Sequence, residues 1–236
     1  MDRIVTTALQ IVDDEGADAL SMRTLAQRLN SGTATLYRHF ASRADLIAAV
    51  VDAMFGAIDL DVAALSELPW QDACKAAAHS MFDVLRDHRN VTPMLAGDVP
   101  IGPNALAARE QMLAFLLDTG FSSALAARSY ATLARYVLGF AMQLDNSHGD
   151  LGDAKLAQIF HDLDPCEFPA TVSVADSLPV PFEEEFAFGL DLIVDGLTKA
   201  LQYERPQGKS KRSGQASART PRPMTPTQNH GANVKR

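Results

Sequence analysis

The chain has few cysteines, no long apolar segment and no run of alternating β-strand residues. Cys74 and Cys166 are the only cysteines among 236 residues and lack CxxC spacing, so we expect a reduced protein without structural disulfides. The longest apolar runs, such as Leu46–Val51, fall far short of the roughly 20 residues of a membrane-spanning helix. Asp2 and Arg3 lead directly into an amphipathic pattern, so we expect no signal peptide. These absences indicate a cytoplasmic protein that does not bind membranes.

Catalytic and metal-binding arrangements are also missing from the sequence. It contains no Ser/His/Asp order, no glycine-rich phosphate loop and no paired catalytic carboxylates. His161, Asp162, Asp164 and Cys166 have metal-capable side chains, but an acidic loop accounts for them more simply. We therefore expect no enzymatic activity, no cofactor and no bound metal.

The net charge of −8 is distributed unevenly along the chain. Residues 21–43 contain four arginines and no acidic residue, whereas residues 51–203 contain 8 Lys/Arg against 22 Asp/Glu. Residues 204–236 again carry 8 basic residues and only one Glu. A small basic face on an acidic body is typical of a protein that contacts phosphate groups with one end only.

Apolar residues at helical spacing predict an all-α protein. A fourth helix should begin at the capping box Ser42–Asp45, and a long helix should cover residues 122–147. Residues 164–181 contain four prolines and predict a long irregular loop. We expect three regions: an N-terminal three-helix domain at 1–46, a helical domain at 47–203, and a disordered basic tail at 204–236.

Two short helices joined by a glycine-containing turn predict a helix-turn-helix. Ser21 is a good N-cap for the first helix, and Asn30-Ser31-Gly32 has the chemistry of a turn. In the second helix Leu36 and Phe40 can anchor the core while donor-rich side chains face outward. Such a helix suits the DNA major groove, although its composition alone is equally compatible with an ordinary polar surface helix.

Residues 20–40 read LSMRTLAQRLNSGTATLYRHF, and residues 42–46 read SRADL. This stretch closely resembles the DNA-binding domain of the tetracycline-repressor (TetR) family, of which the TLYRHF run and the following basic residue are hallmarks. Residues 70–71, 116–121 and 186–197 resemble the sensor domain of the same family. The resemblance covers about residues 3–203. It implies a helix-turn-helix domain followed by a helical domain for ligand binding and dimerisation.

The resemblance also implies which residues face double-stranded operator DNA. Arg43 would lie on a phosphate, and Arg38 stands where the tetracycline repressor has a tryptophan, which leaves the sequence preference at that position open. The residues implied to face DNA are Arg23, Thr33, Ala34, Thr35, Tyr37, Arg38 and His39.

A homodimer is expected through the helices at 122–147 and 181–203, which the family pairs in a four-helix interface. Their apolar residues form a seam that we expect to be too apolar for a monomer to leave in water. The seam consists of Tyr130, Leu133, Val137, Phe140, Leu144, Phe186, Leu190, Ile193 and Leu197.

The effector is expected to differ from tetracycline. The family histidine that ligates the drug-bound metal aligns with Leu95, which cannot ligate, so an apolar or aromatic effector without a metal is expected. The acidic body would also tolerate a cationic ligand. The expected pocket residues, with His79, Arg135 and Gln143 as the polar contacts, are His79, Met81, Phe82, Leu95, Met112, Phe115, Arg135, Phe140 and Gln143.

Together these features predict a ligand-responsive transcriptional repressor. Its dimer would bind a palindromic operator, and effector binding would shift the population toward a form that releases DNA. Two alternatives stay open: an all-helical enzyme and a DNA-binding protein that responds to no ligand. An internal cavity in the second domain would argue against the latter.

Overall fold

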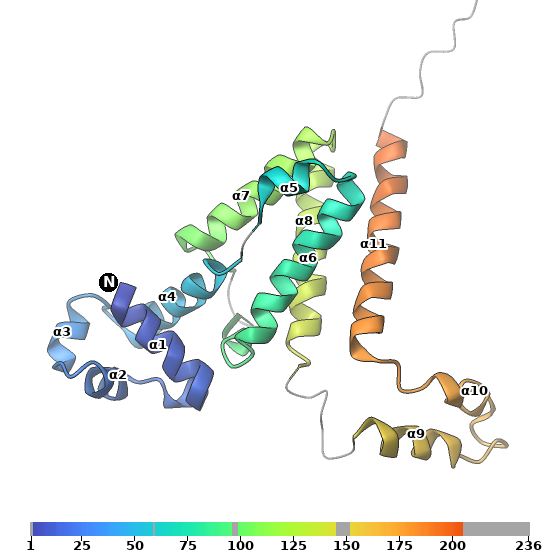
Figure 1. The fold of residues 1–236 in the computed structure, drawn as a ribbon, viewed down its shortest axis with the longest axis horizontal. Coiled ribbons are helices and arrows are strands. Elements are labelled where there is room, and N and C mark those ends of the chain that lie inside the picture. Colours follow the sequence, from blue (N-terminus) through green and yellow to red (C-terminus); the bar gives the residue numbers. More distant parts are fainter. Residues whose placement is uncertain (1, 59, 96–98, 145–151, 205–236) are drawn as a thin grey trace, which may run out of the picture. The chain divides into compact units, whose positions relative to one another are not determined.

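The structure is a computed structural model that describes residues 2–58, 60–95, 99–144 and 152–204. These residues form eleven α-helices and three short 3-10 helices, and none of them lies in a β-strand (Figure 1). The predicted all-α fold is confirmed. Nearly all of the predicted basic tail at 204–236 lies outside the described residues, as do residues 145–147 of the predicted long helix. Within the described ranges no helix is long and apolar enough to cross a membrane.

The N-terminal region is a small helical module built around α1. Gly16, at φ 85°, ends this helix in the left-handed conformation that glycine adopts without strain. Ile11, Leu25 and Leu46 are fully buried and join three of its helices in one core. The elements are α1 (Asp2–Glu15), η1 (Ala17–Ala19), α2 (Met22–Arg28), α3 (Thr33–Tyr37) and α4 (Arg43–Phe55).

The remaining helices form a second, larger packing unit. α6 packs against α8 and α11, and α8 also packs against α7 (Figure 1). The elements are α5 (Val62–Ser66), α6 (Trp70–Asp87), η2 (Thr92–Leu95), α7 (Pro103–Asp118), α8 (Ser123–Ala141), α9 (Asp153–His161), α10 (Pro169–Ser173), η3 (Ala175–Ser177) and α11 (Phe182–Glu204).

Two segments differ from the sequence-based expectation. The predicted irregular loop at 164–181 contains α10 and η3, which pack against each other and against α9. Pro169 lies in the first turn of α10, where a missing N–H removes no helical hydrogen bond. The second difference is α5, a five-residue helix too short to show apolar periodicity. It is capped by Asp61, whose carboxylate accepts from the amide of Ala64 at 3.0 Å.

The predicted domain boundary between residues 46 and 47 falls inside α4. This helix runs without a break from Arg43 to Phe55 and packs against both α1 and α7. Its residues Val50 and Met54 are fully buried. The two regions therefore share a rigid element rather than a flexible linker.

Candidate DNA-binding face and ligand cavity

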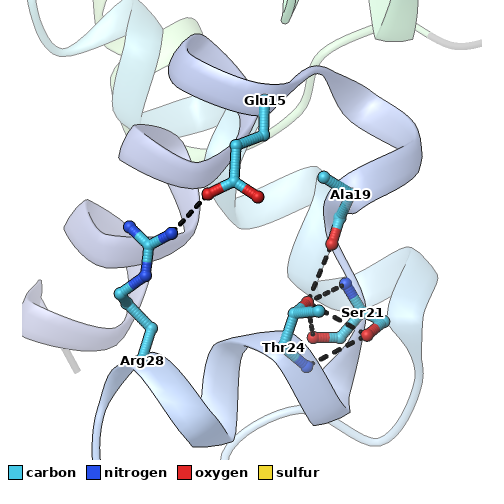
Figure 2. Close-up of polar contacts among 5 residues, drawn as sticks. All are labelled: Glu15, Ala19, Ser21, Thr24 and Arg28. Carbon is cyan, nitrogen blue, oxygen red and sulfur yellow. Dashed lines mark hydrogen bonds and ion pairs between the residues drawn. The ribbon is translucent and has the colours of Figure 1, made fainter.

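The first helix of the helix-turn-helix is fixed by a capping box at its start (Figure 2). The Ser21 hydroxyl accepts from the amide of Thr24 at 3.1 Å, and the Thr24 hydroxyl accepts from the amide of Ser21 at 2.9 Å. The Thr24 hydroxyl lies 2.8 Å from the carbonyl oxygen of Ala19, to which it can donate. At the other end of α2, Arg28 forms an ion pair with Glu15 of α1, as Figure 2 shows. These contacts hold α2 against the helix that precedes it.

The turn between α2 and α3 has the conformation that its residues predict. Asn30 adopts a positive φ of 51°, which asparagine tolerates better than most residues. The amide of Ser31 then donates to the carbonyl of Ala26 at 2.9 Å, and Gly32 caps α3. The turn thereby presents α3 at a fixed angle to α2, as a helix-turn-helix requires.

α3 divides its residues between the core and the solvent. Leu36 is fully buried and Phe40 nearly so, which anchors the helix as predicted. Tyr37 is 55% exposed. Of the other residues predicted to face DNA, Thr35 is half-buried and the exposed ones are Arg23, Thr33, Ala34, Arg38, His39 and Arg43. The helix ends at Tyr37, so Arg38 and His39 lie in the turn that follows it rather than within it.

Arg43 has a structural role that the sequence did not indicate. Its Nε donates to the carbonyl of Leu20 at 3.0 Å, and its Nη2 donates to the carbonyl of Ala17 at 3.1 Å. The guanidinium therefore ties the start of α4 to the connection between α1 and α2. Its remaining N–H groups could still reach a phosphate, so the predicted DNA contact stays a prediction.

Two neighbouring chambers lie among α4, α6, α7 and α8. The inner one has a volume of about 70 Å³ and the outer one about 350 Å³. The inner chamber is lined by Phe55, Ile58, Leu60, Cys74, Ala77, Ala78, Met81, Ala105, Ala108, Arg109, Met112, Tyr130, Leu133, Ala134 and Val137. The outer chamber is lined by Phe55, Met81, Leu95, Val99, Pro100, Ala105, Arg109, Tyr130, Ala131, Ala134, Arg135 and Leu138. Because six residues line both, we describe the two chambers as one cavity.

The polar groups of the cavity centre on Arg109. Its Nε donates to the Tyr130 hydroxyl at 3.2 Å, and its Nη2 donates to the Pro100 carbonyl at 3.1 Å. The guanidinium carbon also lies 5.8 Å from the centroid of the Tyr130 ring. Cys74, in the inner chamber, is fully buried, and burial raises the pKa of its thiol to about 12. Sequence reasoning missed Arg109, although it lies three residues, less than one helical turn, before the predicted pocket residue Met112.

Four of the nine predicted pocket residues line the cavity, and five do not. Those that do are Met81, Leu95, Met112 and Arg135. His79 and Gln143 are exposed, and Phe115 packs against the core away from the cavity. Phe82 stacks on Phe186 with ring centroids 4.4 Å apart.

Phe140, another predicted pocket residue, belongs to an aromatic cluster beneath α11. Its ring contacts Tyr136 at 4.9 Å, Phe182 at 5.2 Å and Phe186 at 5.3 Å. The Tyr136 hydroxyl donates to the carbonyl of Phe186 at 2.7 Å, and burial, followed by the charge of Glu185, raises the pKa of Tyr136. These aromatic side chains attach α11 to the protomer instead of lining the cavity.

The predicted dimer seam is corrected in part, because some of its residues face inward within the single chain. Leu133, Val137, Phe186 and Leu190 are buried within the single chain, because α11 packs across α6 and α8 of the same protomer. Tyr130 faces the cavity. The other predicted residues are partly buried against the same core, namely Phe140, Leu144, Ile193 and Leu197.

Polar contacts at two places join the cavity helices to the N-terminal module. Asp52 of α4 accepts from the backbone amides of Asn104 and Ala105 at the start of α7, with Oδ1 3.0 Å from each nitrogen. At the end of α6, His88 Nδ1 lies 2.9 Å from Asp13 Oδ2 of α1, and the Asn90 side chain donates to the Asp13 carbonyl at 2.8 Å. These bonds connect the end of α6 to α1 and the start of α7 to α4.

Comparison with known proteins gives two family matches. Residues 4–50 match the model described as bacterial regulatory proteins, tetR family, and residues 64–201 match the tetracyclin repressor-like C-terminal domain. An HTH-type transcriptional regulator of Saccharopolyspora erythraea is 35% identical over 138 residues, and the match covers 58% of each chain. The tetracycline repressor protein class C of Escherichia coli is 28% identical over 84% of this chain and 90% of its own length.

Solved structures agree with these matches. Apo ActR from Streptomyces coelicolor superposes with a TM-score of 0.77 at 31% identity, covering 86% of this chain and 96% of ActR. ActR has also been crystallised in complex with (S)-DNPA and with actinorhodin, and both complexes superpose with a TM-score of 0.75.

Proposed function

Because the chain belongs to the TetR family of bacterial regulatory proteins, we propose that it is a repressor whose homodimer binds a palindromic operator and is released by a small molecule in the cavity. The observation that carries this proposal is the capping of α7, a cavity helix, by Asp52 of α4, the last helix of the N-terminal module. Ligand occupancy and the position of the helix-turn-helix are thereby physically linked.

The exposed side chains around α3 support the DNA-binding part of the proposal. Tyr37 at the end of α3 and His39 in the turn that follows are exposed, and Leu36 and Phe40 anchor this segment in the core. Hydroxyl, imidazole and guanidinium groups are suited to base edges and phosphates. No described acidic residue lies between Met22 and Ala44 to repel the DNA backbone.

The exposed face of α11, opposite the face that carries Phe186 and Leu190, supports dimerisation. Phe188, Leu192 and Tyr203 are 66%, 57% and 89% exposed, and their spacing places them with Gly196 on one stripe opposite the buried side of the helix. Large apolar side chains concentrated in this way are typical of a protein interface. We assign this stripe to contact with a second copy of the chain, since a symmetric pair would bury the same face on both protomers.

The cavity supports a response to ligand. Its walls come from α7 at Ala105, Arg109 and Met112, within two turns of the Asp52 cap. A ligand that favours one position of α7 would shift the population of α4 positions by as much as its affinity differs between them. The cavity argues against the alternative of a DNA-binding protein that responds to no ligand. The crystallisation of ActR with two small molecules is in keeping with the same use here.

The experiment begins with the full chain and a genomic DNA library. Fragments retained by the protein are sequenced, and the shared site is tested for two-fold symmetry and for a stoichiometry of two chains per site. The isolated site is then challenged with a panel of aromatic compounds, with and without a metal chelator. We expect a symmetric site and release by at least one compound in the presence of chelator. Asymmetric binding by one chain, or release that requires Mg²⁺, would overturn the proposal.

A further inference from the structure

We propose that the cavity selects a ligand that combines an aromatic or apolar body with an acidic group, a carboxylate or an ionised phenol, and that Arg109 is the residue that selects the acid. This inference rests on the proposed ligand-responsive function and names the chemical class of the ligand. The apolar walls favour the aromatic or apolar body of such a ligand, and the Arg109 cation among them favours its acidic group.

Arg109 is held in a defined position by the cavity itself. It is half-buried, its Nε is engaged by Tyr130 at 3.2 Å, and its Nη2 is engaged by the Pro100 carbonyl at 3.1 Å. These bonds use two of the five N–H donors of a guanidinium, so the others remain for a ligand. The Tyr130 hydroxyl accepts from Arg109 and keeps its own proton to donate. An oxyanion beside the pair could therefore accept from both residues.

No counter-charge accompanies this cation in the part of the chain that the structure describes. None of the residues lining either chamber is Asp or Glu, and no described carboxylate forms an ion pair with Arg109. Asp98 lies outside the described residues. A charge placed among apolar walls is stabilised by a partner of opposite sign, which an acidic ligand would supply.

A second arginine extends the same preference to the outer chamber. Arg135 is exposed and lines that chamber, and among the described residues its Nη1 donates to the Ala131 carbonyl, at 3.5 Å. The acidic residues of the surrounding helices, such as Asp72, Asp83 and Glu110, are exposed and line neither chamber. The acidic residues named here therefore belong to the surface, and the cavity lining gives no support to the expectation that this region would tolerate a cationic ligand.

The test compares acids with their uncharged amides. Calorimetric titration of the full chain without DNA uses three pairs of increasing size: benzoate and benzamide, 2-naphthoate and 2-naphthamide, and anthraquinone-2-carboxylate and its carboxamide. We expect at least one acid to bind about 10- to 100-fold more tightly than its amide, the range for a hydrogen bond to a charged group. If no acid binds more tightly than its amide, the inference is overturned.

Variants then assign the preference to Arg109. R109Q should lower the ratio of acid to amide affinity, leaving only the contribution of Arg135, and R109K should retain more of it. R128Q removes an exposed arginine of α8 outside the cavity and should leave the ratio unchanged. A ratio within one variant does not depend on how much of that variant is folded. An undiminished ratio in R109Q would overturn the assignment. Acid binding without operator release would contradict the proposed function and leave this inference intact.

Discussion

The carboxylate of Asp52 caps a helix to which it does not belong, because its Oδ1 accepts the backbone amide of Ala105 at 3.0 Å, 53 residues further along the chain. The same carboxylate accepts from the backbone and side chain of Asn104. Gly102 stands before this site, and a Cβ there would overlap the Asp52 side chain. The contact thus depends on a carboxylate in α4 and on a glycine before α7.

Replacing Asp52 with alanine should weaken the communication between cavity and operator. The substitution leaves two amides of α7 without their acceptor and should lower the free energy of unfolding by about 1 kcal/mol, as for the loss of other N-caps. The coupling is measured as the ratio of effector affinities with and without operator DNA, and it should fall toward one.

Asp61→Ala provides the matched control for this prediction. Asp61 also caps a helix, because its carboxylate accepts from the amide of Ala64 at 3.0 Å. That helix, α5, packs against α6, so this cap does not join α4 to α7. D61A should lower the free energy of unfolding by a similar amount and leave the ratio of effector affinities with and without operator DNA unchanged. Equal loss of coupling in both variants would show that it reflects stability rather than the contact with α7.

Tyr37→Ala should weaken operator binding by about 1–3 kcal/mol, since each good contact at a base edge contributes that much. The melting temperature should change little because the side chain is 55% exposed. Leu36→Ala, one position earlier and fully buried, should instead cost about 2–4 kcal/mol of stability. Gel-shift titration and thermal unfolding distinguish the two. Unchanged DNA affinity in Y37A would refute the assignment of α3 as the recognition helix.

Phe188→Asp on the outer face of α11 should convert the dimer into a monomer. A charge placed in the proposed interface would be buried without a partner, whereas in the isolated protomer it would be solvated. Leu117→Asp, at a 45% exposed apolar position on α7, is the control and should remain dimeric. Sedimentation velocity at micromolar concentration measures both. A wild-type chain that sediments as a monomer would contradict the interface itself.

The two cysteines should react very differently with iodoacetamide at pH 8. Burial raises the pKa of Cys74 to about 12, so its thiol stays protonated well above this pH and is also shielded from the reagent. Cys166 is exposed. Mass spectrometry should find one adduct on the native chain, at Cys166, and two after denaturation in guanidinium chloride. Native modification of Cys74 at the rate of Cys166 would show that the inner chamber opens in solution.

Local sequence signals predicted the N-terminal module well. Ser21, Ser42 and Gly16 act on their immediate neighbours, so their roles follow from short-range chemistry. The inward direction of Leu36 follows from helical spacing alone. Such features do not depend on how distant segments meet.

The cavity and the dimer face were harder to predict because they depend on which helix covers which. Phe186 and Leu190 form an apolar stripe that could pack either against a second copy of the chain or against other helices of the same chain. Residue spacing is the same in both cases and cannot distinguish them. Once α11 covers α6 and α8, Phe82 and Phe140 are used in packing, while Arg109 and Tyr130 are left to line the cavity. Arg109 and Tyr130 are 21 residues apart, so no local pattern joins them.

The two tethers of α4 give this helix the geometry of a lever. Arg43 fixes one end to the carbonyls of Ala17 and Leu20, and Asp52 fixes the other to α7. Nine residues separate them, or about 14 Å along the axis at 1.5 Å per residue. A sideways shift of about 1 Å at Asp52 then tilts the helix by about 4° around Arg43. The tilt would be passed to the recognition helix through side chains that are already packed and bonded, so a small adjustment beside a bound molecule could change the angle at which two copies meet the DNA.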